Sequence, residues 1–299
     1  MKWKFANSQS ITFGYGKHSQ LQSLSLYLVD IEDSENGKEP VNKDLDFNKS
    51  QHFVISYDNL PVKDLRLKID LYYQYLWSIP IPKDTAGNDY LKSYSSINDV
   101  NGFADESLEN RGRGENYGIE FSVEKFFSKG WYALLTASLY ESKYTAKDGI
   151  KRNTRFNGNY ICNVLGGKEF MIKNNILGAN IKYSLVGGRK YAPIKGVQVL
   201  RDKNGDPVIN QLTGKEVIVP QTDWANVFSL KLKDYSRLDM SIFYRVNKPK
   251  LAHVLTVEIQ NILNTQNIGG FSYYDTRVHD YMFWYQSGLI PIFKYRVEF

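Results

Sequence analysis

Alternation of apolar and polar residues is the dominant pattern along this chain, and it is clearest between Leu65 and Trp77. Every second residue there is apolar or aromatic, as at Leu65, Ile69 and Trp77, while residues such as Arg66 and Asp70 occupy the positions between. A period of two residues is typical of a β-strand whose faces meet different surroundings. The run exceeds the about 5–6 residues of a typical globular strand. It suits a tilted membrane crossing of about 9–11 residues.

The same alternation recurs along the chain and predicts about ten strands. They are expected over residues 10–16, 51–57, 65–77, 117–124, 131–139, 156–171, 177–185, 238–246, 255–259 and 289–299. Short turns such as 59–64 and 173–175 alternate with long polar segments such as 17–49, 80–114 and 191–234. Outer-membrane barrels combine short periplasmic turns with long extracellular loops in this order. The expected fold class is therefore all-β, an antiparallel transmembrane β-barrel portion of about ten long meander strands.

The final segment has one apolar face and one fully charged face. The apolar face consists of Phe293, Tyr295, Val297 and Phe299. The chain stops on the last of these aromatic residues. A closing strand of this kind is what the barrel assembly machinery is expected to recognise in outer-membrane clients. These four residues are therefore our predicted assembly signal.

Composition agrees with such a barrel. The chain of 299 residues is 42% hydrophobic with a mean hydropathy of −0.43, and it has no run of about 18 apolar residues, so we expect no transmembrane helix. In a barrel strand only every second side chain faces lipid, so the mean hydropathy of the whole chain stays low. The 22 Tyr, 16 Phe and 5 Trp residues fit aromatic girdles at the membrane interfaces. An ordinary Tyr-rich all-β protein is the alternative.

The net charge of +6 raises the question of a nucleic-acid partner. Lys and Arg are scattered along the strands, however, and form no basic cluster or stacking motif, so none is expected. The single Cys162 excludes an intramolecular disulfide framework and a cysteine-based metal site. Residues 1–8 contain no apolar segment of about 7–15 residues and so no secretory signal. Because an outer-membrane protein needs one, either the barrel interpretation is wrong or this chain is the C-terminal portion of a longer chain.

A search for chemistry finds no catalytic or metal-ligating motif, and no cofactor is expected. The four histidines are dispersed, and no phosphate loop, nucleophile elbow or dinucleotide fingerprint is present. Segments 30–37 and 202–206 carry oxygen ligands and a glycine, but neither completes an EF-hand. We interpret both as solvated turns, with loop calcium as the open alternative.

Aromatic residues in the predicted loop near the C-terminus are the candidates for ligand contact. They belong to the aromatic segments 271–274 and 281–285, with Tyr273, Tyr274, Trp284 and Tyr285 as the candidate residues. The alternative for the second segment is an interface girdle. The charges expected on the inner face should pair with one another or with a plug. They are Arg66, Asp70, Glu120, Glu124, Lys182, Arg237, Asp239, Arg245 and Glu258.

A set of ordered segments carries a family resemblance. These segments are 57–58, 65–80, 116–120, 166–170, 187–189, 235–240, 261–267 and 289–299. Together they resemble the C-terminal barrel half of TonB-dependent receptors. Among these they are most similar to Bacteroidetes members, which often carry a carboxypeptidase-regulatory-like domain. The resemblance covers essentially the whole chain, so residues 1–299 are expected to be roughly the last ten of about 22 strands.

The resemblance implies a receptor of the Gram-negative outer membrane, without enzymatic activity, for energy-coupled uptake of a large or scarce nutrient such as a siderophore, glycan, peptide or cofactor. Its implied partners are outer-membrane lipid, the barrel assembly machinery, a plug domain absent from this chain and, through that plug, TonB. Two other classes stay open. One is a stand-alone ten-stranded outer-membrane protease-like barrel using His18 and His279, and the other is a soluble Tyr-rich binding module.

Overall fold

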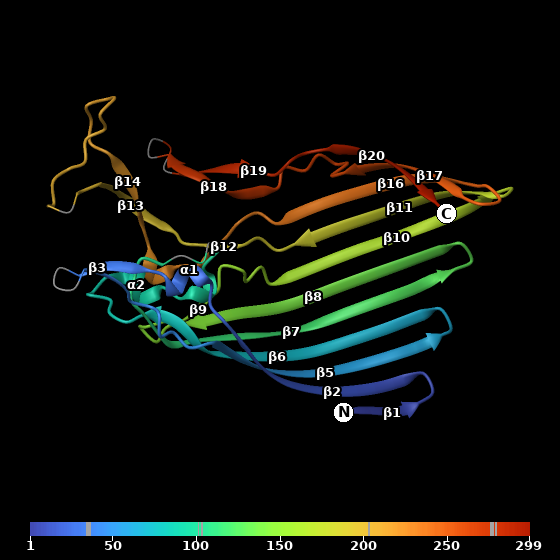
Figure 1. Cartoon of the computed structure of the whole chain (residues 1–299), viewed down its shortest axis with the longest axis horizontal. Coiled ribbons are helices and arrows are strands. Elements are labelled where there is room, and N and C mark those ends of the chain that lie inside the picture. Colours follow the sequence, from blue (N-terminus) through green and yellow to red (C-terminus); the bar gives the residue numbers. More distant parts are fainter. Residues whose placement is uncertain (34–36, 101, 103, 203, 276–277, 279) are drawn as a thin grey trace.

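One antiparallel sheet runs through the chain and organises the fold (Figure 1). The computed structural model describes residues 1–33, 37–100, 102, 104–202, 204–275, 278 and 280–299. Neighbouring strands in the sheet follow chain order, and only the strands of the long connections are skipped. The sheet contains β1 (Lys2–Ala6), β2 (Gln9–Gln20), β5 (Asn48–Val62), β6 (Leu65–Pro82), β7 (Leu108–Ser128), β8 (Trp131–Thr145), β9 (Lys151–Asn153, paired with β8), β10 (Tyr160–Ile172), β11 (Asn175–Val186), β16 (Tyr235–Asn247), β17 (Ala252–Gln260) and β20 (Ile290–Glu298).

Short turns lie at one end of the sheet and long connections at the other (Figure 1). In the turn between β7 and β8, Lys129 and Gly130 have φ of 52° and 74°, as a type I′ hairpin requires. We use the name crown for the long connections together with the strand ends that they cover. These connections are residues 21–47, 83–107, 146–159, 187–234 and 261–289. Its small elements besides β9 are α1 (Leu24–Tyr27), β3 (Asp30–Asp33), β4 (Gly37–Pro40), α2 (Asp89–Ser93), η1 (Ser96–Asn98), β12 (Lys190–Tyr191), β13 (Ile194–Val199), β14 (Ile218–Thr222), η2 (Trp224–Asn226), β15 (Leu230–Lys231), β18 (Ile268–Asp275) and β19 (Asp280–Tyr285).

The prediction of about ten long strands is confirmed, because each expected strand corresponds to one strand of the sheet. The prediction omits β1, which pairs with β2 through Trp3 and Ile11. The strand expected over 156–171 begins only at Tyr160. It is shorter because Asn157 is fully buried in the preceding turn, where its amide donates to the Glu141 carboxylate at 3.0 Å.

The loop expected over 80–114 is shorter than predicted. β6 continues to Pro82 and β7 begins at Leu108, so the two strands stay paired well into the crown. At the crown end of β6, Ile79 and Ile81 are only 2% and 3% exposed. These strand ends pass into a buried core in which both faces of the strand are covered. Apolar and polar residues therefore do not alternate there, and the period of two residues is lost.

Strand register gathers the apolar residues on one face of the sheet. Ile55, Leu71, Ile119 and Leu139 are aligned across β5 to β8, and Ile242, Val257 and Phe293 across β16, β17 and β20. Their exposed fractions include 49% for Leu71, 54% for Ile242 and 78% for Phe293. An apolar surface of this extent marks an interaction with a membrane or another protein.

The described sheet is open rather than closed into a barrel. β1 and β20 lie at the two ends of the strand order, so each has one neighbour in the sheet. Each edge therefore leaves backbone donors and acceptors without a ladder partner, which hydrocarbon cannot satisfy. The structure thus shows an antiparallel meander of barrel type without its closure.

Polar side chains on the opposite face bond to one another. Tyr132 donates to Asn180 at 2.9 Å, Asn180 donates to Ser241 at 3.1 Å, and Ser184 donates to Asn163 at 2.8 Å. Of the nine charges expected to pair with one another or with a plug, only Arg237 and Asp239 pair with each other in the described structure. Four others form ion pairs with residues outside that set, namely Arg66 with Asp58, Asp70 with Lys68, Arg245 with Glu298 and Glu258 with Lys294. Within the described residues, Glu120, Glu124 and Lys182 form none.

The apolar cores of the molecule lie in the crown. One joins Leu26, Ala104 and Leu108, and the other joins Ile81, Tyr144 and Ala146. No helix in the described part of the chain is both long enough and apolar enough to cross a membrane. The buried cores hold the long connections together and so create the site described next.

Candidate functional site

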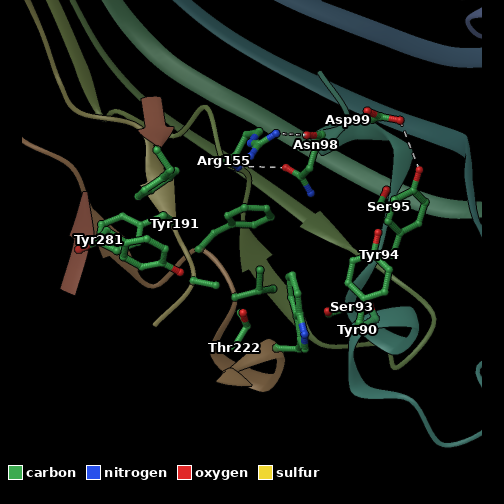
Figure 2. A pocket seen from close by; sticks show the side chains of 15 residues that line it. Tyr90, Ser93, Tyr94, Ser95, Asn98, Asp99, Arg155, Tyr191, Thr222 and Tyr281 are labelled. Atoms are coloured by element: carbon green, nitrogen blue, oxygen red, sulfur yellow. Dashed lines mark hydrogen bonds between the residues drawn. The ribbon is translucent and has the colours of Figure 1, made fainter. Parts of the chain in front are cut away.

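The crown encloses a cavity of about 300 Å³ (Figure 2). Its lining comes from residues 90–99, Arg155, 191–192, 222–228, Phe271 and Tyr281. These segments belong to four different connections, so the cavity exists only when the crown is folded. This volume is at the lower end of the roughly 300–1,000 Å³ of small-molecule sites.

The short helix α2 places one aromatic wall. Asn88 caps the helix by accepting the Tyr90 N–H at 2.9 Å, which satisfies a free donor of the first turn. At the other end the buried Tyr144 hydroxyl donates to the Ser93 carbonyl at 2.8 Å and anchors α2 to β8. Tyr90 and Tyr94, four residues apart, therefore project together toward the cavity.

Aromatic rings from distant segments complete the walls. Trp224 of η2 meets Tyr90 edge-on with ring centroids 4.7 Å apart. On the opposite side Tyr191, Phe271 and Tyr281 form a cluster, with Phe271 and Tyr281 4.6 Å apart. Burial raises the pKa of the Tyr90, Tyr191 and Tyr281 hydroxyls, so these phenols stay neutral at ordinary pH.

Arg155 and Asn98 provide the polar part of the cavity. The Asn98 side-chain oxygen accepts the Arg155 backbone N–H at 3.0 Å, and the Arg155 guanidinium donates to the Asn98 carbonyl at 3.2 Å. The guanidinium also lies 5.9 Å from the Phe228 ring centroid. Burial and the charge of Arg189 lower the pKa of Arg155, although a guanidinium stays charged at ordinary pH.

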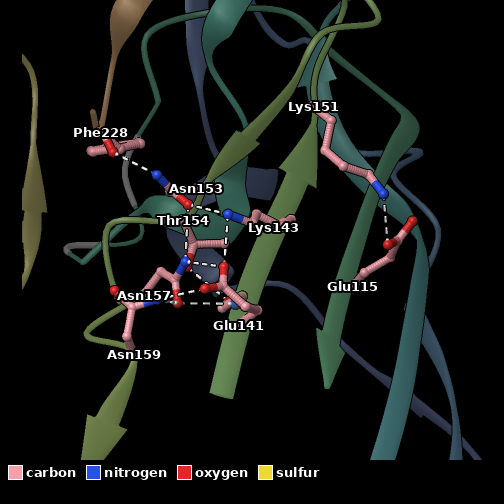
Figure 3. Close-up of polar contacts among 10 residues, drawn as sticks. Glu115, Glu141, Lys143, Lys151, Asn153, Thr154, Asn157, Asn159 and Phe228 are labelled. Carbon is pink, nitrogen blue, oxygen red and sulfur yellow. Dashed lines mark hydrogen bonds and ion pairs between the residues drawn. The ribbon is translucent and has the colours of Figure 1, made fainter. Parts of the chain in front are cut away.

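A polar network next to β8 holds the segment that carries Arg155 (Figure 3). The Asn157 amide donates to both Glu141 and Asn153, at 3.0 and 2.9 Å. Thr154 donates to the Ser142 hydroxyl at 2.8 Å, and the Ser142 N–H donates to Asn157 at 3.1 Å. These bonds fix the residues on both sides of Arg155, and the bond to the Asn98 carbonyl orients its guanidinium.

The predicted ligand contacts lie in the hairpin of β18 and β19. Tyr274 packs against Tyr281 with ring centroids 5.4 Å apart, while Trp284 and Tyr285 are 51% and 50% exposed. The backbone of Tyr273 pairs with Met282, and its side chain lies outside the described residues. None of the other three lines the cavity, and their contact with a ligand stays a prediction.

Phe271 and Tyr281, which begin the two predicted aromatic segments, do line the cavity. Its other lining residues were missed by sequence reasoning. Tyr90 and Tyr94 could have been found as an aromatic pair at helical spacing after an Asn cap. Arg155 carries no motif, and only the fold brings it beside Asn98.

The residues considered for protease or calcium chemistry form no such site in the described part of the chain. The His18 and His52 rings are 5.0 Å apart, and His52 bonds to Gln74 at 2.9 Å, while His279 lies outside the described residues. No group of three or more His, Cys, Asp or Glu residues with metal-binding geometry occurs among the residues described.

Of the two calcium candidates, residues 34–36 and 203 lie outside the described residues. In the second candidate the Asp202 carboxylate accepts the backbone N–H groups of Asn204 and Asp206, each at 2.9 Å. These bonds are those of an ordinary Asx-type turn.

Comparison with known proteins identifies the fold. No family model and no curated protein matches the sequence. Among solved structures, the chain resembles the ferric-catecholate import receptor Fiu of Escherichia coli K12, with 13% identity, a TM-score of 0.55 and coverage of 99% of this chain and 34% of that one.

The ferric yersiniabactin uptake receptor FyuA of Yersinia pestis gives 12% identity and a TM-score of 0.57 over 100% of this chain and 36% of that receptor. The ferripyoverdine receptor of the Pseudomonas aeruginosa outer membrane gives 13% and 0.56 over 99% and 32%. The chain thus has the fold of part of a TonB-dependent receptor barrel, and it spans about a third of the length of these structures.

Proposed function

We propose that residues 1–299 form the C-terminal part of the barrel of an outer-membrane TonB-dependent receptor for energy-coupled nutrient uptake. The observation that carries this proposal is the sheet itself, which has one apolar and one polar face, ends in two open edges and matches about a third of receptor barrels. The motif resemblance supports the Bacteroidetes type with a carboxypeptidase-regulatory-like domain. In this assignment the remaining strands close the barrel, and a plug elsewhere in the protein contacts TonB.

The imported ligand would first meet the crown. Aromatic cavities with a few convergent polar groups are typical of small-molecule sites, and the crown cavity has this composition. The solved receptors with this fold are named for ferric ligands, and the present chain is proposed only to share the general task of nutrient uptake. Tyr273, Tyr274, Trp284 and Tyr285 remain candidates for contacts outside the cavity.

The closing strand β20 is proposed to act as the assembly signal. Phe293 and Tyr295 are 78% and 62% exposed on the apolar face, and the terminal Phe299 is fully exposed. Deleting Phe299 from the full-length natural protein should therefore lower its amount in the outer membrane, as measured by surface protease accessibility. An unchanged surface level would contradict this role.

Two measurements test the proposed function. The full-length natural protein should fractionate with the outer membrane, and recovery in the soluble fraction without detergent would refute the assignment. The 299 residues expressed alone should give no uniform single-channel conductance in liposomes, because the two open edges need the other strands. Reproducible channels of one size would mean that these strands close by themselves.

A further inference from the structure

We propose that the crown cavity binds the carboxylate of a small acidic ligand, or of the acidic arm of a larger one, whose flat apolar body lies between the aromatic walls. The proposal concerns Arg155, Asn98 and Ser95 together with the rings of Tyr90, Trp224 and Tyr281. Its biological role rests on the proposed function, because the ligand would be the imported nutrient.

The first argument compares two arginines three residues apart. Arg152 forms an ion pair with Asp148 at 2.6 Å, and the Arg152 side chain is only 7% exposed. Arg155 is also partly buried, yet among the described residues it has no carboxylate within ion-pair distance. Buried charges are normally paired, since desolvating an unpaired charge is costly. Arg155 therefore presents a charge that an anionic group can neutralise.

The second argument is two buried polar atoms without partners. The Asn98 side-chain nitrogen and the Ser95 hydroxyl make no hydrogen bond within the described structure, and these residues are 8% and 1% exposed. Figure 2 shows the Asn98 amide directed into the cavity. A buried donor left unsatisfied destabilises the fold, and a ligand oxygen that accepts from it removes that cost. The oxygens of one carboxylate could accept from Asn98 and Arg155 together.

The one acidic side chain in the described lining does not favour a cationic ligand. The Asp99 carboxylate accepts the Gly102 N–H at 3.1 Å and the Tyr94 hydroxyl at 3.5 Å, so each of its oxygens already has a partner within the crown. In this described lining, the buried atoms without a hydrogen-bond partner are the Asn98 side-chain nitrogen and the Ser95 hydroxyl, and Arg155 adds one positive charge. This set selects an oxyanion over an amine.

The aromatic walls define the rest of the ligand. Tyr90 and Trp224 lie on one side, and Tyr191, Phe271 and Tyr281 on the other. Ring systems stack or meet edge-on at such walls with centroid separations of about 4.5–7 Å. A flat apolar body with a carboxylate at one end fits both the walls and the donors.

The test uses the full-length natural protein in detergent and two probes, 2-naphthoate and its neutral analogue 2-naphthylmethanol. Titration calorimetry should show tighter binding of naphthoate. Arg155→Gln should weaken naphthoate binding about 10- to 100-fold, the usual range for a charge-assisted hydrogen bond, while Arg155→Lys should lose less. Asn98→Asp keeps the acceptor for the Arg155 N–H but replaces the free donor with a negative oxygen, so naphthoate binding should be lost.

Two controls separate binding from folding. Arg111→Gln changes an arginine on β7 whose side chain is 75% exposed and lies outside the cavity, so naphthoate affinity should not change. The neutral probe should bind all variants alike if the aromatic walls are intact. Equal affinity for the two probes, full binding by Arg155→Gln, or no saturable naphthoate binding would each overturn the proposal. None of these results would alter outer-membrane fractionation, so they are distinct from failure of the proposed function.

Discussion

The sheet and the crown differ in where they place their large apolar side chains: the crown buries them, and the sheet exposes them. Among the described residues, eight of the ten buried apolar side chains belong to the crown or to the strand ends it covers, and the other two, Ala252 and Val254, lie at the turn end of the sheet. In the sheet, large apolar residues such as Leu139 and Ile242 are 61% and 54% exposed. The crown therefore buries its apolar residues as a protein in water does, whereas the sheet exposes them along one face.

The same exposed fraction of an apolar side chain therefore has a different meaning in the sheet and in the crown. In the sheet the register aligns apolar residues on one face across strand after strand, which would be an aggregation hazard in water. In the crown the same residue types are buried, and polar groups such as Asn157 are paired. Substitutions should therefore have effects that depend on the region.

The largest effect is expected for Tyr144→Ala in the crown. Tyr144 is 1% exposed and packs with Ile81 and Ala146, and truncating a buried aromatic residue costs about 3–5 kcal/mol. Hydrogen exchange of residues 83–100 should accelerate while exchange in β10 and β11 stays slow. Tyr144→Phe, which removes only the bond to the Ser93 carbonyl, should be milder. Equal acceleration in the sheet would show that the two regions unfold as one.

A somewhat smaller effect is expected for Ile242→Lys near the middle of β16. A lysine facing the bilayer midplane costs about 2–4 kcal/mol. Ser241→Lys is the matched control, since Ser241 lies on the polar face and accepts a bond from Asn180. Urea unfolding of the full-length natural protein in lipid vesicles measures both. If the two variants lose the same stability, the faces have been assigned wrongly.

The smallest effect concerns the pH dependence of stability at Asp234, which lies at the border where the crown meets the sheet. Burial raises the pKa of Asp234, but bonds from the Tyr160 hydroxyl, Lys231 and the Gly188 N–H outweigh burial and hold that pKa at about 2, below the ordinary 3.8. Because the folded pKa is the lower one, the stabilisation is complete above about pH 4 and is lost as the pH falls toward 2.

The check is the hydrogen-exchange rate of the Gly188 amide between pH 5 and pH 2, corrected for intrinsic exchange. Protection should fall with pH in the natural sequence, whereas Asp234→Asn should start lower and change less. A flat profile in the natural sequence would show that Asp234 does not hold this border together.

The strands were predictable because each has one apolar and one polar face, which produces a period of two residues in the sequence. The same alternation exists in β1, where Trp3 and Phe5 alternate with lysines, but five residues are too few for the pattern to predict a strand. The crown ends of β6 and β7 were not predictable from this pattern. There both faces of the strands are packed rather than one, so the apolar and polar residues do not alternate. For example, Gly112 lies so close to Ile79 and Ile81 that an added Cβ would come within 2.7 Å of the Ile81 side chain.

The cavity was beyond sequence reasoning for a different reason. Its members are separated by long stretches of chain, and contacts such as that between Arg155 and Asn98 depend on loops without periodicity. Aromatic enrichment near residues 271–285 indicated one wall, through Phe271 and Tyr281, but not the polar groups opposite it. The bonds to Asn98 and the buried network around Asn157 together hold Arg155 at this place.

The central claim is that the two faces of the sheet meet different solvents, and a nitroxide scan of residues 239–243 tests it most directly. Single cysteines would be introduced in the full-length natural protein with Cys162 replaced by alanine, and the labelled protein placed in liposomes. Collision with oxygen should be frequent at positions 240 and 242 and rare at 239, 241 and 243. An absent or reversed alternation would contradict the account.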